Sequence, residues 1–75
     1  MKITIRARIM KKRKGVFEWI AIKGNSFLEI AAKLSKINFL GFEFVRYDGN
    51  QEYAKGMIAR KVDQIRSART AVVIG

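Results

Sequence analysis

Hydrophobic and polar side chains alternate along the first ten residues. The odd positions are apolar, namely Ile3, Ile5, Ala7 and Ile9. The even positions are polar or cationic, namely Lys2, Thr4, Arg6 and Arg8. Because successive side chains of a β-strand point to opposite faces, this period of two predicts a strand over residues 2–10 with one apolar and one basic face.

A second strand is predicted over residues 16–23, VFEWIAIK, which are rich in β-branched and aromatic types. The intervening KKRKG ends in Gly15, which is free to adopt a positive φ. The two strands therefore form a predicted β-hairpin.

A helix is predicted to follow, because apolar residues then recur at helical spacing. This stripe consists of Phe27, Ile30, Ala31, Leu34 and Ile37. Ser26 is the expected N-cap, and Glu29 completes the capping-box pattern three residues later. Asn38 is expected to close the helix in the left-handed conformation.

The last third of the chain contains a predicted third strand, GFEFVRY at residues 41–47, and a DGN turn at 48–50. Two structures compete after the turn: a helix capped by Asn50, or a hairpin strand over QEYAKGMI. The helix is favoured because its apolar period holds over residues 54–68, although Gly56 lowers its stability by about 1 kcal/mol. The apolar tail TAVVIG is either a short fourth strand or the end of this helix.

The predicted order is ββαβα, with a C-terminal strand as an open alternative. A helix of crossover length joins the second and third strands, so these two run parallel and the first strand lies between them, antiparallel to both. The sequence therefore predicts an α+β fold: a two-layer sandwich with both helices on one face of an antiparallel or mixed sheet.

This arrangement divides the strand residues between two faces. The helix-covered face is expected to receive Ile3, Ile5, Ala7, Ile9, Val16, Ile20, Ile22, Phe42 and Phe44, with Glu18 near an edge. The opposite face is expected to carry Lys2, Thr4, Arg6, Arg8, Phe17, Trp19, Lys23, Glu43, Val45 and Tyr47. Aromatic and cationic side chains interleaved on an open sheet are suited to stacking on bases and anchoring phosphates.

Phe17 and Trp19 allow three interpretations at this point. They form a stacking surface for bases, they are covered by a second subunit, or they point into the core while Ile20 and Ile22 point outward.

LGFEFVRY at residues 40–47 resembles the RNP1 octapeptide of RNA-recognition-motif domains, and the following EYAKGMIARKV resembles the helix after it. That octapeptide reads basic-Gly-aromatic-Gly/Ala-Phe-Val-x-aromatic, and the resemblance implies RNA contact through its aromatic residues. Leu40 and Glu43 depart from the pattern, and the family begins βαβ where this chain begins ββα. If Glu43 points outward, Phe42 and Phe44 belong to the core, the reverse of their role in that family.

Composition narrows the class of protein. The 75 residues form one small basic domain, residues 1–75, with sixteen Lys and Arg against six Asp and Glu and a net charge of +10. There is no Cys and no His, so neither a disulfide nor the usual zinc site is expected, and no cofactor or metal is predicted. A chain this short buries only about 60% of its unfolded surface, so a homo-oligomer is expected.

No apolar run approaches the ~20 residues of a membrane span, and no signal peptide precedes the first strand. The sequence thus predicts an intracellular, cytoplasmic protein. The usual nucleophile–base pairs cannot be built without His or Cys, and no carboxylate pair has catalytic spacing, so the chain is predicted not to be an enzyme.

Half of the cations lie within residues 2–23, with Glu18 as the one acid. This bias predicts a nucleic-acid-binding module, for DNA or RNA, that grips phosphates electrostatically. Its candidate binding residues are Arg6, Arg8, Lys11, Lys12, Arg13, Lys14, Phe17, Trp19 and Lys23. The alternative is a compact protein-binding modulator or inhibitor, of the kind encoded by viruses and mobile elements, that docks on an acidic or nucleic-acid-handling partner.

A weaker group of cations lies on the predicted second helix, where a solvated helix face is the favoured interpretation. These residues are Lys55, Arg60, Lys61, Arg66 and Arg69.

Overall fold

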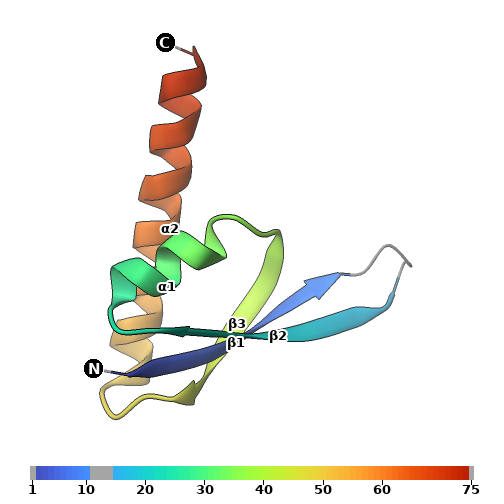
Figure 1. The fold of residues 1–75 in the computed structure, drawn as a ribbon, viewed down its shortest axis with the longest axis vertical. Coiled ribbons are helices and arrows are strands. Elements are labelled where there is room, and N and C mark those ends of the chain that lie inside the picture. The colour runs from blue at the N-terminus through green and yellow to red at the C-terminus, as the bar shows by residue number, and fades with distance from the viewer. Residues whose placement is uncertain (1, 11–14, 75) are drawn as a thin grey trace.

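A computed structural model describes the backbone of residues 2–10 and 15–74, and the side chains of this part up to residue 69. The elements are β1 (Ile3–Met10), β2 (Phe17–Gly24), α1 (Phe27–Leu34), β3 (Phe39–Arg46) and α2 (Gln51–Ile74). Figure 1 shows their order along the chain. The predicted ββαβα order is confirmed.

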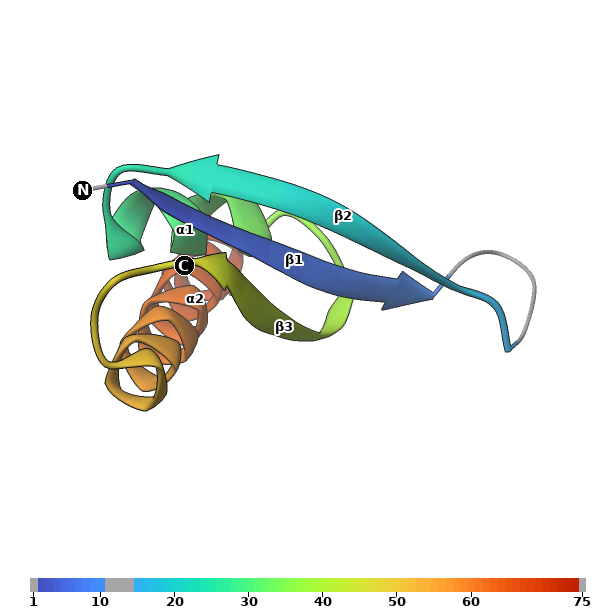
Figure 2. The same cartoon turned by 90° about the horizontal axis from the view of Figure 1, so that it is seen from below.

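The three strands form one sheet in the order β2-β1-β3, and β1 runs antiparallel to both neighbours. The central position predicted for the first strand is therefore confirmed. Both helices lie on the same side of the sheet, and Figure 2 shows the other side uncovered. We call this uncovered side of the three strands the open face.

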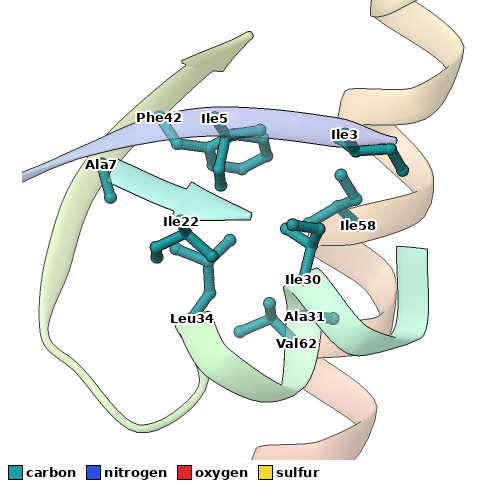
Figure 3. Close-up of a cluster of buried hydrophobic side chains, with 10 residues drawn as sticks. All are labelled: Ile3, Ile5, Ala7, Ile22, Ile30, Ala31, Leu34, Phe42, Ile58 and Val62. Carbon is teal, nitrogen blue, oxygen red and sulfur yellow. The ribbon is translucent and has the colours of Figure 1, made fainter. Parts of the chain in front are cut away.

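The core lies between the sheet and the helices (Figure 3). It consists of Ile3, Ile5, Ala7, Ile22, Ile30, Ala31, Leu34, Phe42, Ile58 and Val62. Phe44 and Ile20 pack against this cluster. The apolar faces predicted for β1 and β3 are thus confirmed, except that Ile9 is only half-buried.

The far end of the β1–β2 hairpin extends beyond both helices (Figures 1 and 2). Val16 was expected on the helix-covered face but is exposed, because no helix reaches this end of the hairpin. Gly15 has the positive φ expected of it, 86°.

Helix α1 begins as predicted but ends earlier. The Ser26 hydroxyl accepts a hydrogen bond from the Glu29 backbone N–H at 3.1 Å, and the Glu29 carboxylate accepts one from the Asn25 N–H at 2.8 Å. The helix ends at Leu34, and among the described non-glycine residues none has a positive φ, so the left-handed cap predicted at Asn38 is wrong.

Arginines from α2 bind the segment that follows α1. Arg66 donates a hydrogen bond to the Ile37 carbonyl at 2.9 Å, and Arg69 donates to the carbonyl and hydroxyl of Ser35 at 3.2 and 3.0 Å. Cations beside a helix C-terminus interact favourably with its dipole. The end of α1 is therefore held both locally, by the Ser35 hydroxyl that donates to the Ala32 carbonyl at 2.7 Å, and by a distant helix.

Helix α2 starts where the helical alternative placed it. The Asn50 side chain accepts a hydrogen bond from the Tyr53 N–H at 3.0 Å, which is an N-cap. Its 24 residues span about 36 Å, so it continues past α1 (Figure 1). The backbone is helical to Ile74, so the alternatives of a hairpin strand after the DGN turn and of a C-terminal strand are wrong.

Candidate nucleic-acid interface

Cross-strand pairing arranges the open face in rows. Antiparallel partners face the same side of a sheet, so the even-numbered residues of β1 define each row. From the N-terminal end of β1, the rows are Lys23–Thr4–Arg46, Ala21–Arg6–Glu43, Trp19–Arg8–Gly41 and Phe17–Met10. Cationic residues therefore occupy one end of the face, and aromatic and apolar residues occupy the other.

Arg6 lies at the centre of the face and is bound on both sides. Its guanidinium forms an ion pair with the Glu43 carboxylate, to which the Nε also donates a hydrogen bond. On the other side, its Cζ lies 4.4 Å from the centroid of the Trp19 ring. Cation–π contacts of this kind hold both side chains in place.

Arg8 occupies a different environment one row further along. Its Cζ lies 5.1 Å from the Phe17 ring and 6.0 Å from the Trp19 ring. Its partner on β3 is Gly41, which has no side chain. No described carboxylate forms an ion pair with Arg8, so its charge remains available to a ligand.

Phe17 and Trp19 are each 47% exposed on this face. The interpretation that places them in the core is therefore wrong, since Ile20 and Ile22 point toward the helices instead. Exposed aromatic rings held between arginines present π-faces on which a planar group can stack.

Two register shifts in the pairing of β1 with β3 change which β3 residues lie on the open face. They lie between Thr4 and Ile5 and between Arg8 and Ile9, and they leave Val45 and Leu40 without partners on β1. As a result Arg46 pairs with Thr4 on the open face, a position that simple alternation assigned to the helix side.

The same shift moves Tyr47 away from the open face, so its predicted position there is wrong. The Tyr47 ring stacks on Phe44 with centroids 5.1 Å apart, and it lies 5.9 Å from Phe27 of α1. Tyr47 therefore packs against the core.

Two hollows adjoin the open face. The first, of about 390 Å³, lies at its cationic end and is lined by Lys2, Ile3, Thr4, Lys23, Gly24, Asn25, Glu29 and Arg46. The second, of about 380 Å³, is lined by Arg8, Trp19, Phe39, Gly41, Phe42, Glu43, Lys55 and Ala59. The first has three cations against one carboxylate, Glu29, which already accepts from the Asn25 N–H and lies 3.8 Å from the Lys33 Nζ, so its net positive charge suits phosphate. The aromatic rings in the second are suited to a planar ring.

The structure brings together five of the nine predicted site residues. Arg6, Arg8, Phe17, Trp19 and Lys23 share the open face. The other four, Lys11, Lys12, Arg13 and Lys14, lie outside the described residues. The sequence analysis did not include Arg46 among the site residues, because no local sequence pattern predicts the register shift that turns it outward.

The cations of α2 have separate positions. Arg66 and Arg69 bind the end of α1, and the Arg66 Cζ also lies 5.3 Å from the Phe39 ring. The Lys55 Nζ lies 5.6 Å from the Phe42 ring and beside the second hollow. The expected solvated face therefore holds for Arg60, which is exposed, but not for the two arginines that bind α1.

The outward direction of Glu43 also tests the resemblance to RNP1. Glu43 pairs with Arg6 on the open face, whereas Phe42 is buried and Phe44 packs on the core. These two side chains belong to the helix-facing side of β3 rather than to the open face. The likeness thus holds for the sequence pattern and for the helix that follows it, but not for the direction of the aromatic side chains.

Other site types find little support in the described part of the chain. No three His, Cys, Asp or Glu side chains gather there in a way that would hold a metal ion. No helix within those residues is long and apolar enough to cross a membrane. Comparison of the chain with protein-family models, curated proteins and solved structures gave no match.

Proposed function

We propose that this protein is a small, non-enzymatic nucleic-acid-binding module that contacts its partner through the open face. The observation that carries the proposal is the pairing of exposed aromatic rings with arginines on the side of the sheet that no helix covers. Trp19 and Phe17 supply the rings, and Arg6 and Arg8 supply the cations. Base stacking on such rings contributes about 1–3 kcal/mol per base.

Phosphate contacts would come from the cationic end of the face. Lys23 and Arg46 flank Thr4 on the two outer strands, and Lys2 lines the same hollow. Strands in a sheet lie about 4.8 Å apart, so Lys23 and Arg46 begin about 10 Å from each other. Two cations at this separation can each contact a different phosphate of a nucleic-acid strand that crosses the sheet.

Net charge supports the same assignment. The chain carries +10, and Glu43 is the one acid among the described residues of the open face, where its charge is taken up by Arg6. A surface of one sign steers polyanions toward itself and releases their counterions on binding.

A second candidate is the protein-binding modulator, and the exposed apolar side chains of β3 favour it. Leu40 and Val45 are 52% and 60% exposed at the two register shifts. Exposed apolar residues near cations also suit a protein partner with an acidic, partly apolar surface.

Titration of labelled single-stranded and duplex DNA and RNA, over a range of salt concentrations, tests the proposal. We expect binding that weakens with salt. Arg8→Gln should lower the affinity, and it should make the log–log slope of affinity against salt shallower by about 0.7–0.9, the value for one phosphate contact. Arg60→Gln removes the same charge from an exposed position on α2 and should leave the slope unchanged. Wild-type protein that binds none of the four nucleic acids at low salt contradicts the proposal and favours the second candidate.

A further inference from the structure

Gly41 occupies a position in the sheet that does not require glycine. It lies within β3, opposite Arg8 of the central strand. Its φ is not positive, and a Cβ atom added to it would meet nothing within 4 Å. Glycine in a strand lowers the stability of the fold. At this position it also leaves open space beside the strand.

That space is the second hollow, which crosses the edge of β3. Trp19 and Arg8 border it on the open face, and Lys55 and Ala59 of α2 border it on the helix side. Its volume of about 380 Å³ lies within the range of small-ligand pockets. Aromatic and aliphatic side chains form much of its lining, which suits a planar ring.

The two cations that border the hollow have no described acidic partner. Arg8 lies over the Phe17 and Trp19 rings, and the Lys55 Nζ lies 5.6 Å from the Phe42 ring. Glu43, the carboxylate that lines this hollow, is already paired with Arg6. A ligand with a planar ring and a negative charge on either side of it therefore matches the hollow and its rim.

We infer that the hollow over Gly41 receives one unpaired base of a single-stranded nucleic acid, with the phosphates that flank this base near Arg8 and Lys55. Bases inside a duplex are stacked and paired and cannot enter, so the protein prefers single strands to duplexes. This inference rests on the proposed function and adds to it the class of nucleic acid that is bound.

The variant Gly41→Val tests the inference because a Cβ atom at this position meets nothing within 4 Å, so the side chain projects into the open space of the hollow and takes up part of it. Ala21→Val is the matched control, since Ala21 is exposed on the same face but does not line the hollow. Each protein is titrated with a labelled single strand and with a duplex of the same sequence at one salt concentration. Thermal unfolding of each variant checks that it is folded.

Wild type and Ala21→Val should bind the single strand more tightly than the duplex. Gly41→Val should lose roughly tenfold or more in single-strand affinity, the order expected for one stacking contact, and keep its duplex affinity. If Gly41→Val does not fold, Ala59→Leu fills the same hollow from α2 and should give the same result.

A folded variant with a filled hollow and unchanged single-strand affinity overturns the inference but leaves the proposed function standing. Equal losses for both nucleic acids, or a wild-type preference for duplex, also overturn it. Wild type that binds neither nucleic acid contradicts the proposed function itself.

Discussion

Arg6 and Glu43 lie opposite each other on β1 and β3 and form an ion pair in the middle of the open face. The pair is not a major source of stability, because both side chains are 48% exposed and surface ion pairs contribute about 0–1 kcal/mol. Its larger effect is to neutralise one of the cations that would otherwise meet a polyanion.

The variant Glu43→Gln should therefore bind nucleic acid more tightly than wild type. Freeing Arg6 adds about one phosphate contact, so the salt slope should become steeper by about 0.7–0.9. The free energy of unfolding should change by less than about 1 kcal/mol. Asp63→Asn, which removes an acid from the exposed surface of α2, is the control and should leave the slope unchanged. Unaltered binding by Glu43→Gln would show that Arg6 does not contact phosphate.

Trp19 should be accessible to solvent in the free protein, because its side chain is about half exposed beside Arg6 and Arg8. Its fluorescence should be quenched efficiently by acrylamide, and added nucleic acid should protect it. The measurement requires a sample shown to be monomeric. Blue-shifted emission that resists the quencher in such a sample is the contrary result.

The four consecutive cations at residues 11–14 provide a third test. Closing a hairpin turn does not require four like charges, whereas each phosphate contact would use one. If the run makes three contacts, changing all four residues to Ser should make the salt slope on duplex DNA shallower by about 2.7. Stability should change by less than about 0.5 kcal/mol, because the substitutions relieve repulsion among four like charges. A folded quadruple variant with the wild-type slope would assign the run to solubility.

The core should tolerate truncation poorly. Ile58 is fully buried on α2 and contributes to the cluster between the helices and the sheet. Ile58→Ala should lower the free energy of unfolding by about 2–5 kcal/mol, measured by urea denaturation. Met57→Ala, at a half-buried neighbouring position, should cost less. Equal losses at the two positions would contradict the burial pattern.

Self-association is expected because the core of this 75-residue chain is small and has no disulfide to support it. Light scattering at high micromolar concentration should give a mass above that of the monomer. A strict monomer at that concentration would contradict the expectation.

The sequence predicts most of this fold because its elements follow local rules. Alternation in β1, the helical period of α1 and α2, and the caps at Ser26 and Asn50 each depend on residues close in the chain. The same alternation places Arg6, Arg8 and Trp19 on the open face.

What the sequence does not predict depends on contacts between distant segments. The register shifts at Leu40 and Val45 arise from pairing with β1, and they turn Arg46 outward and Tyr47 inward. The segment after α1 is bound by Arg66 and Arg69, about 30 residues further along. The hollow at Gly41 appears only when α2 lies beside β3.

The hairpin end that extends beyond the helices has a consequence for how this protein can diversify. Val16 and Phe17 contribute nothing to the buried cluster, so substitutions there carry little penalty in folding. The rest of the sheet, anchored by Ile3, Ile5 and Ile22, supplies the rigid support. Selection can therefore exchange the chemistry of the hairpin end while the scaffold stays the same.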